Sequence, residues 1–400
     1  MALGAALAAC GDDPAIDPVD LSVNLGEPEV LVPFSQPVDG IATQPANNNL
    51  DVAVFGGRTF LAFRTAPTHF ASAETELYVA SEGPEGFRFE GRFAKGTDLR
   101  EPRLLALGDR LFLYYAELGA DFSKFEPNGA WVTEYIAPGQ WAEPERVGEV
   151  DFIPWRAKVI DGKAYVVGYS GGANIYEFDG EPLRVHFLTT TDGRTLEPVV
   201  PEKPIVQEGG GSETDFTFLP NGTLVAVTRN EAGDAGFGFG SKICRAEPGA
   251  LADWTCKADP KKYDSPLVFS HGGRAWLVGR RNVTDTGHFD LGRDDLSLEE
   301  QAKHYAVEYS FQPKRCALWS LDADALTATF VADLPSRGDT CFPSMLPKDD
   351  RTVTIYNYSN ALDGAPDCAT WPSDCNDLAW WVGQGQPTVI YRIDAELGLP

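Results

Sequence analysis

Apolar and polar residues alternate along this chain in a unit that occurs six times. In each copy an apolar segment ends at a turn containing Gly, Asp or Asn, and a second apolar segment follows the turn. The second segments read GRTFLAFR, DRLFLYYA, GKAYVVGY, GTLVAVTR, GRAWLVGR and RTVTIYNY, starting at residues 57, 109, 162, 222, 273 and 351. Short alternating runs bounded by turn residues predict β-hairpins.

The hairpins recur at nearly regular intervals. Measured between the second residues of the quoted segments, the intervals are 52, 53, 60, 51 and 78 residues. Four-stranded propeller blades take roughly 45 to 60 residues, so we predict an all-β, six-bladed β-propeller with an insertion before the last blade. Helical periodicity is confined to residues 294–308, inside that insertion. We expect a strand near residues 29–33 to pair with residues 388–392, since closing the ring leaves no open sheet edge.

The first ten residues, MALGAALAAC, resemble a bacterial lipobox, in which signal cleavage leaves a diacylated cysteine at Cys10. A basic stretch normally precedes such a segment, and we expect it upstream of Met1. This interpretation places the protein in the bacterial cell envelope, lipid-anchored at the outer membrane or on the periplasmic face. Residues 1–10 are then a signal remnant, residues 11–48 a tether and first strand, and residues 49–397 a single propeller domain. The alternative is an Ala-rich N-terminus with a chance cysteine.

Composition excludes several classes of partner. The net charge of −26 and the pI near 4.5 disfavour nucleic acid, because phosphate binding needs clustered Lys and Arg. No apolar run reaches the ~20 residues that a membrane span needs. Apart from the lipid anchor we therefore expect no membrane contact. We also expect a monomer without a cofactor.

The cysteines predict disulfides. Six remain once Cys10 is lipidated, and they allow fifteen connectivities. Pairing of sequence neighbours places each bridge across a hairpin or loop, which favours three bridges and an oxidising compartment. Zinc is disfavoured because no CxxC or HxxxH pair occurs among them. Calcium bound by Asp and backbone oxygens stays open, although no EF-hand spacing occurs. The expected pairs are Cys244 with Cys256, Cys316 with Cys341, and Cys368 with Cys375.

Propeller geometry gathers polar residues at one end of the channel, where the first strand of each blade starts and the second strand ends. Arg presents a planar fork that matches carboxylate or sulfate, and Asp or Glu accepts from sugar hydroxyls, so we expect a glycan or another anionic small ligand. Any single Arg here is equally explained by a structural ion pair, and the aromatic residues nearby by the core. The predicted substrate-binding residues are Arg64, Arg103, Arg156, Tyr169, Asp215, Arg229, Asp264, Arg280 and Asp339.

Several segments resemble the sialidase superfamily of six-bladed propellers and its uncharacterised exported relatives. They are SETDFTFLPNGTLVAVTRNE (212–231), DSPLVFSHGGRAWLVGRRN (264–282), GDTCFPSM (338–345) and TIYNYSN (354–360). Residues 190–196, TTDGRTL, resemble the Asp box of that superfamily, S-x-D-G-x-T-W, with Leu in place of Trp, and residues 81–87 are a degenerate copy. The Asp box is a turn between outer strands and bears on the fold alone.

The resemblance implies a glycoside hydrolase with a Tyr nucleophile, activated by a Glu, beside an acid/base Asp and three Arg that hold the substrate carboxylate. Tyr358 matches the nucleophile, Glu213 its partner and Arg229 one of the three Arg. The first blade has Asn47 to Asn49 where the superfamily has an Arg, and no Asp follows its second strand. His69 or Glu74 then remains as the proton donor.

Three hypotheses remain open for the function. One is an exo-acting, sialidase-like enzyme on anionic sugars, using Tyr358 or a carboxylate pair such as Glu213 with Asp264. The second is a non-catalytic propeller that binds carbohydrate or protein through the same face. In the third, the Arg and carboxylate side chains pair with one another and fill the channel.

Overall fold

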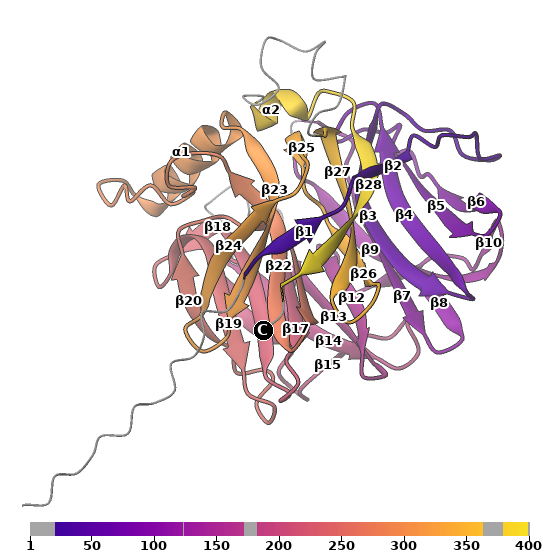
Figure 1. Cartoon of the computed structure of the whole chain (residues 1–400). Coiled ribbons are helices and arrows are strands. Elements are labelled where there is room, and N and C mark those ends of the chain that lie inside the picture. The colour runs from indigo at the N-terminus through magenta and orange to yellow at the C-terminus, as the bar shows by residue number, and fades with distance from the viewer. Residues whose placement is uncertain (1–20, 123, 172–181, 363–378, 399–400) are drawn as a thin grey trace, which may run out of the picture.

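The structure is a computed structural model that describes residues 21–122, 124–171, 182–362 and 379–398. Its strands form six antiparallel sheets arranged around a central axis as the blades of a propeller (Figure 1). The predicted fold class, an all-β six-bladed propeller, is therefore confirmed. Each blade has its first strand near the axis, and successive strands follow outward.

Blades 1 to 3 are built by consecutive strands. Blade 1 contains β3 (Ala46–Phe55), β4 (Arg58–Ala66), β5 (Glu76–Gly83) and β6 (Gly86–Phe93). Blade 2 contains β7 (Asp98–Leu107), β8 (Arg110–Leu118), β9 (Pro127–Ala137), β10 (Gln140–Trp141) and β11 (Glu145–Val147). Blade 3 contains β12 (Ile153–Ile160), β13 (Lys163–Ser170), β14 (Leu183–Thr190), β15 (Glu197–Pro198) and β16 (Ile205–Gly209).

Blades 4 and 5 follow the same plan, and blade 6 combines strands from both ends of the chain. Blade 4 contains β17 (Thr214–Phe218), β18 (Leu224–Asp234), β19 (Gly238–Ala246) and β20 (Thr255–Asp259). Blade 5 contains β21 (Asp264–His271), β22 (Arg274–Asn282), β23 (Lys314–Asp322) and β24 (Thr327–Asp333). Blade 6 contains β25 (Arg337–Thr340), β26 (Ser344–Pro347), β27 (Thr352–Ala361), β28 (Val389–Leu397), β1 (Val23–Leu25) and β2 (Glu29–Val32).

The six repeated segments are the second strands of the six blades: β4, β8, β13, β18, β22 and β27. The turns that precede them show why the sequence folds this way. Gly56 and Gly57 both have positive φ, 57° and 75°, between the paired residues Phe55 and Arg58. Positive φ at both central residues defines the type I′ turn, whose twist matches that of two-stranded hairpins, and glycine adopts it without strain.

The ring closes as predicted. Glu29 pairs with Arg392 and Val32 with Ile390, so β2 adds to the outer side of β28. The Arg392 Nε atom also lies 2.8 Å from Glu29 Oε2. Strand β1 extends the same edge of β28, from Leu25 onward to Val23. The N-terminal strands therefore belong to blade 6.

The insertion in blade 5 carries helix α1 (Leu298–Ser310), which starts later than the predicted residue 294. Ser297 caps its first turn, accepting a hydrogen bond from the Glu300 backbone while the Glu300 side chain returns to Ser297. Residues 294–296 precede this cap, which explains the later start. A second, short helix, α2 (Trp380–Gly383), lies near blade 6. Within the described ranges, no helix is long and apolar enough to span a membrane.

Two of the three predicted disulfides are present. Cys244–Cys256 joins the facing strands β19 and β20. Cys316–Cys341 joins β23 of blade 5 to the residue after β25, and so links blade 5 to blade 6. Cys368, Cys375 and Cys10 lie outside the described residues, so the third bridge and the lipid anchor stay predictions.

The segment that resembles an Asp box is the turn between β14 and β15. Asp192 Oδ1 accepts from the backbone N–H groups of Arg194, at 2.8 Å, and Thr195, at 2.7 Å. These donors hold the pKa of Asp192 well below its usual range. The Gly193 carbonyl accepts from the Tyr114 hydroxyl of blade 2 at 2.7 Å. The turn thus binds blade 3 to blade 2.

Candidate functional site

One end of the propeller gathers the starts of first strands and the ends of second strands, as the sequence predicts. The first strands of several blades carry bulges there, and at three of them a non-glycine residue has positive φ: Asn49 (42°), Glu101 (54°) and Ser265 (51°). A bulge re-aims side chains, and left-handed backbone at non-glycine residues is uncommon and gathers at functional sites. We call this region the strand-start end.

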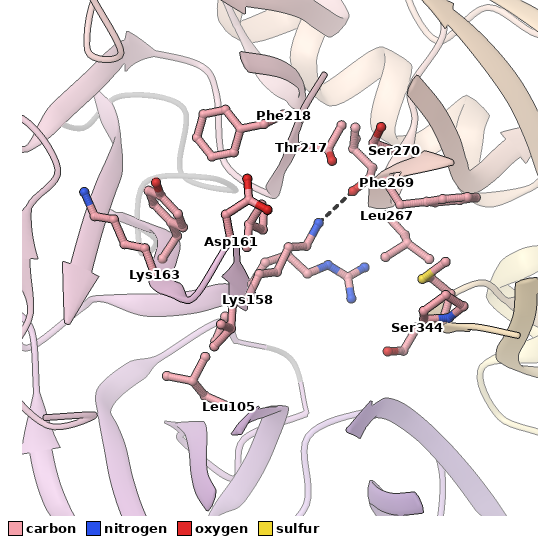
Figure 2. Close-up of a pocket in the computed structure, with 18 of the residues that line it drawn as sticks. Leu105, Lys158, Asp161, Lys163, Thr217, Phe218, Leu267, Phe269, Ser270 and Ser344 are labelled. Carbon is pink, nitrogen blue, oxygen red and sulfur yellow. Dashed lines mark hydrogen bonds between the residues drawn. The ribbon is translucent and has the colours of Figure 1, made fainter. Parts of the chain in front are cut away.

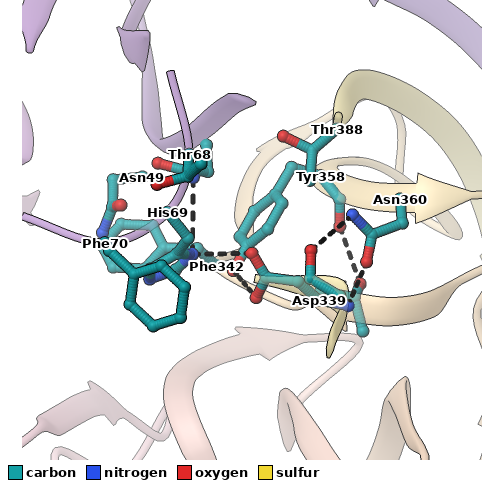
Figure 3. Close-up of polar contacts among 12 residues, drawn as sticks. Asn49, Thr68, His69, Phe70, Asp339, Phe342, Tyr358, Asn360 and Thr388 are labelled. Atoms are coloured by element: carbon teal, nitrogen blue, oxygen red, sulfur yellow. Dashed lines mark hydrogen bonds and ion pairs between the residues drawn. The ribbon is translucent and has the colours of Figure 1, made fainter. Parts of the chain in front are cut away.

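Tyr358, at the end of β27, lies in a hydrogen-bonded group at this end (Figure 3). Its hydroxyl donates to Asp339 Oδ1 at 2.9 Å, and His69 Nδ1 lies 2.7 Å from Asp339 Oδ2. The Trp380 indole N–H also donates to Asp339, at 3.2 Å. Blade 1 supplies His69, and blade 6 supplies Asp339 and Tyr358. The Asp339 carboxylate therefore joins two neighbouring blades.

Burial sets the proton affinities in this group. It raises the pKa of Tyr358 well above the usual range, and Asp339 adds to the rise while Arg280 opposes it. Burial alone would raise the pKa of Asp339, but His69, Arg280 and the Tyr358 hydroxyl together outweigh it and lower that pKa. Burial lowers the pKa of His69, against the opposing effect of Asp339. At neutral pH the resting group therefore contains a neutral phenol hydrogen-bonded to a carboxylate.

A second group, from blades 4 and 5, surrounds Arg229. The Arg229 Nη1 atom lies 2.8 Å from Glu213 Oε1, 3.3 Å from Glu231 Oε2 and 3.7 Å from Asp264 Oδ1. One Glu213 oxygen and one Asp264 oxygen are therefore no more than 6.5 Å apart, the sum of 2.8 and 3.7 Å. Arg280 Nη1 lies 3.3 Å from the other oxygen of Asp264.

The two carboxylates differ in proton affinity. Burial raises the pKa of Glu213 to about 7, and the Asp264 charge adds to the rise while Arg229 opposes it. Burial also acts on Asp264, but Lys262, Arg280, Arg229 and the Tyr309 hydroxyl together outweigh it and lower the pKa. A pair of acids whose pKa values differ in this way can contain one proton donor and one permanent anion at neutral pH.

The two groups meet through Arg280. Its guanidinium lies beside Tyr358 and opposes the rise of the phenol pKa, and its Nη1 atom contacts Asp264. One polar network thus runs through four blades, in the order His69, Asp339, Tyr358, Arg280, Asp264, Arg229 and Glu213. Some solvent reaches it, since the side chains of His69, Glu213 and Arg229 are 14%, 10% and 9% exposed.

Sequence reasoning misplaced one contact and left four network residues out of the predicted site. Among the described residues the hydroxyl partner of Tyr358 is Asp339, whereas Glu213 accepts from the Ser265 backbone at 2.7 Å and pairs with Arg229. The sequence assigned Asp339 to substrate and gave no signal that it faces the phenol. The network residues that the predicted set omits are Glu231, Lys262, Tyr309 and Trp380.

Several predicted substrate-binding residues are bonded within the protein instead. Arg64 is fully buried and donates to Asp98 at 2.9 Å. The Arg156 guanidinium donates to the Pro266 and Pro343 carbonyls, at 2.8 and 2.9 Å. These arginines act as structural contacts between segments.

The other predicted residues lie apart from the network as well. Asp215 accepts from the Val268 backbone at 2.7 Å and pairs with Lys158 at 2.6 Å. Tyr169 is buried in the apolar core, and Glu74 lies exposed in the loop after β4. Arg103 is buried beneath the network.

A large cavity lies at the opposite, turn end of the channel (Figure 2). Its volume is about 1000 Å³, and turn residues such as Asp161 and Pro347 line it. Lys158 lies in its wall, but the ammonium group is already bonded to Asp215 and to the Phe216 and Val268 carbonyls. The cavity therefore lies away from the predicted catalytic residues. No group of three or more His, Cys, Asp or Glu among the described residues is placed to hold a metal ion.

The fold and its arrangement of blades define the class: a sialidase-like six-bladed β-propeller. No protein-family model matches the sequence, and no curated protein matches it. Among solved structures, a protein of unknown function from Dyadobacter fermentans superposes with a TM-score of 0.60 at 15% identity, over 94% of this chain and 99% of that one.

Sialidase structures match the same fold. Trypanosoma rangeli sialidase in complex with 2,3-difluorosialic acid gives a TM-score of 0.52 at 13% identity, over 94% of this chain and 59% of that one. A Hadza microbial sialidase gives 0.50 at 10% identity, over 78% of this chain and 63% of that one. This chain thus spans about three-fifths of the length of those sialidases.

Proposed function

We propose that the strand-start end is a glycan-directed site and that the protein is an exo-acting glycoside hydrolase on anionic sugars. The observation that carries the proposal is the continuous network in which Asp339 contacts Tyr358, and Arg280, Asp264 and Arg229 join Tyr358 to Glu213. It combines a phenol, three carboxylic acids, of which Glu213 and Asp264 differ in proton affinity, and two guanidinium groups. The sialidase-like fold supports the same class of substrate.

In the proposed reaction the Tyr358 oxygen attacks the anomeric carbon, and its proton passes to Asp339, 2.9 Å away. The phenol needs such a base in contact because its pKa is raised. Glu213, with a pKa of about 7, donates its proton to the departing oxygen as the glycosidic bond breaks. Water then attacks the glycosyl-tyrosine, Glu213 takes a proton from that water, and Asp339 returns the proton to Tyr358.

The remaining residues position these groups. His69 donates from Nδ1 to Asp339 in the tautomer protonated at that nitrogen, which fixes the carboxylate beside the phenol. Arg229 and Arg280 orient the anionic group of the sugar.

One observation favours a non-catalytic glycan- or protein-binding propeller as the second candidate. Arg229 and Arg280 are already paired with Glu213 and Asp264, and a cavity of about 1000 Å³ lies at the opposite end of the channel. A ligand would have to compete with these internal pairs, so binding without turnover is the natural alternative.

A substrate screen separates the two candidates. Purified protein is assayed against chromogenic sialosides, uronides and arabinosides, and against the same sugars in a binding assay. We expect Tyr358→Phe and Glu213→Gln each to lower turnover about 10² to 10⁴-fold, the range for loss of a proton-transfer group, while binding persists. Tyr356→Phe, two residues earlier in β27, is the matched control and should keep wild-type turnover. Binding of a sugar without turnover in any assay would establish the second candidate.

A further inference from the structure

Arg103 differs from the other buried arginines of the propeller. It lies in β7 just after the bulge at Glu101, it is completely buried, and none of its three guanidinium nitrogens has a hydrogen-bond partner. The nearest carboxylate oxygen, Glu101 Oε2, lies 3.9 Å from Nη2, beyond hydrogen-bonding range. Arg64 and Arg156, by contrast, are bonded to a carboxylate and to carbonyls. Buried charged groups are normally paired, so this one requires an acceptor.

The surroundings of Arg103 show what kind of acceptor fits. Its guanidinium carbon lies 4.3 Å from the centre of the Phe342 ring and 5.2 Å from that of Trp155. Both rings lie within cation–π range of the guanidinium, and neither ring accepts a hydrogen bond from its N–H groups. The Trp155 indole N–H is also buried without a partner. Arg103 and Trp155 thus both hold buried donors without acceptors, and unpaired donors call for an anion.

Two other buried carboxylates, Asp51 and Asp215, are already bonded to other groups and so do not serve as the acceptor for Arg103. Asp51 accepts from the Leu104 backbone at 2.8 Å and from the Ser344 hydroxyl at 2.6 Å, so both of its oxygens are in use. Asp215 is taken up by Lys158 and the Val268 backbone.

Glu101, the carboxylate nearest to Arg103, is a weak counterion. Burial raises its pKa, and its oxygens already accept from Asn49, both at 3.1 Å. Arg103 is thus a cation without a hydrogen-bonded carboxylate among the described residues.

We infer that Arg103 and the Trp155 indole N–H hold a small inorganic anion of chloride size on the propeller axis. A single-atom anion satisfies in-plane donors without needing acceptors or donors of its own. It also neutralises a charge that would otherwise cost several kcal/mol to bury. This site is independent of the proposed catalytic function, since none of the proton-transfer groups takes part in it.

Thermal unfolding at constant ionic strength tests the site. Sodium gluconate is exchanged stepwise for sodium chloride up to about 0.1 M, and the midpoint should rise by a few degrees because the anion binds the folded state alone. Arg103→Met keeps a side chain between the two rings but loses the donors, so its midpoint should not respond. Arg274→Met, at a distant hairpin turn, is the matched control and should respond like wild type. A flat wild-type response, or an equal response in Arg103→Met, overturns the inference.

Crystals of the wild-type protein grown in bromide test the anion site directly, even if Arg103→Met fails to fold. We expect an anomalous scattering peak within hydrogen-bonding distance of an Arg103 nitrogen. Ordered water alone at that place, or the Glu101 carboxylate turned onto the guanidinium, overturns the inference.

Discussion

At the scale of single residues, this propeller gives different pKa values to two carboxylic acids that contact the same guanidinium group. Arg229 contacts both Glu213 and Asp264, yet the pKa of the first is raised and that of the second is lowered. The difference comes from additional cations, since Lys262 and Arg280 lie against Asp264. Glu213 is therefore the group in this network whose protonation responds to pH near neutrality.

Glu213 should make stability depend on pH. Its pKa is about 7 in the folded protein and 4.5 ordinarily, so the folded state holds the proton more tightly. The resulting stabilisation is complete below pH 4.5 and is lost as pH rises to 7. Between these limits the free energy of unfolding of wild type should fall by about 3 kcal/mol relative to Glu213→Gln, at ~1.4 kcal/mol per unit.

Urea unfolding at several pH values measures this difference. Glu208→Gln, at an exposed side chain in β16, is the control and should follow wild type at every pH. A difference between wild type and Glu213→Gln that does not change with pH would contradict the assignment.

At the scale of elements, the turns determine much of the fold. Gly193 in the turn between β14 and β15 has φ of +75°, and a Cβ there would collide with the Phe112 ring of blade 2. Gly162 in the turn before β13 has φ of +76° and open space around it. The two glycines have the same backbone conformation and differ in their packing.

Alanine at these glycines should therefore separate backbone strain from packing. Gly162→Ala should lower the free energy of unfolding by about 1 to 2 kcal/mol, the cost of left-handed backbone. Gly193→Ala should cost a further ~1 to 3 kcal/mol because the methyl group displaces the Phe112 ring. Guanidinium unfolding midpoints measure both losses. Equal losses would show that the contact between blades 2 and 3 relaxes freely.

Elements set by local chemistry were predictable from the sequence, and contacts between blades were not. Glycine turns fixed the hairpins and their register, so the positions of β4 and β22 followed directly. The pairing of Tyr358 with Asp339 depends on how neighbouring blades meet, for which a single strand carries no signal. Likewise Arg64 stood at a predicted site position, but Asp98 of the next blade satisfies it.

At the scale of the whole molecule, the ring depends on its N-terminal strands. Strands β1 and β2 both pair with β28, and the partly buried side chains of Val23 and Leu25 pack against the apolar core of blades 5 and 6. Without them the outer edge of β28 is unpaired, and an open edge invites pairing with another chain.

Two truncations test this dependence. A protein starting at residue 21 keeps β1 and β2 and should match the full chain in its unfolding midpoint. A protein starting at residue 34 lacks both strands and should unfold at a lower temperature and self-associate in size-exclusion chromatography. A monomeric, equally stable protein starting at residue 34 would show that the ring closes without them.

The pairing of β2 with β28 also affects when blade 6 can fold during synthesis of the chain. Glu29 is made 363 residues before Arg392, its partner in the sheet. Blade 6 therefore cannot close until β28 has been made, and a product that stops before β28 lacks the partner strand. Such fragments keep an unpaired N-terminal segment. Proteases can therefore cleave this segment in unfinished chains, in which it is unpaired, and not in finished ones, in which it is part of the sheet.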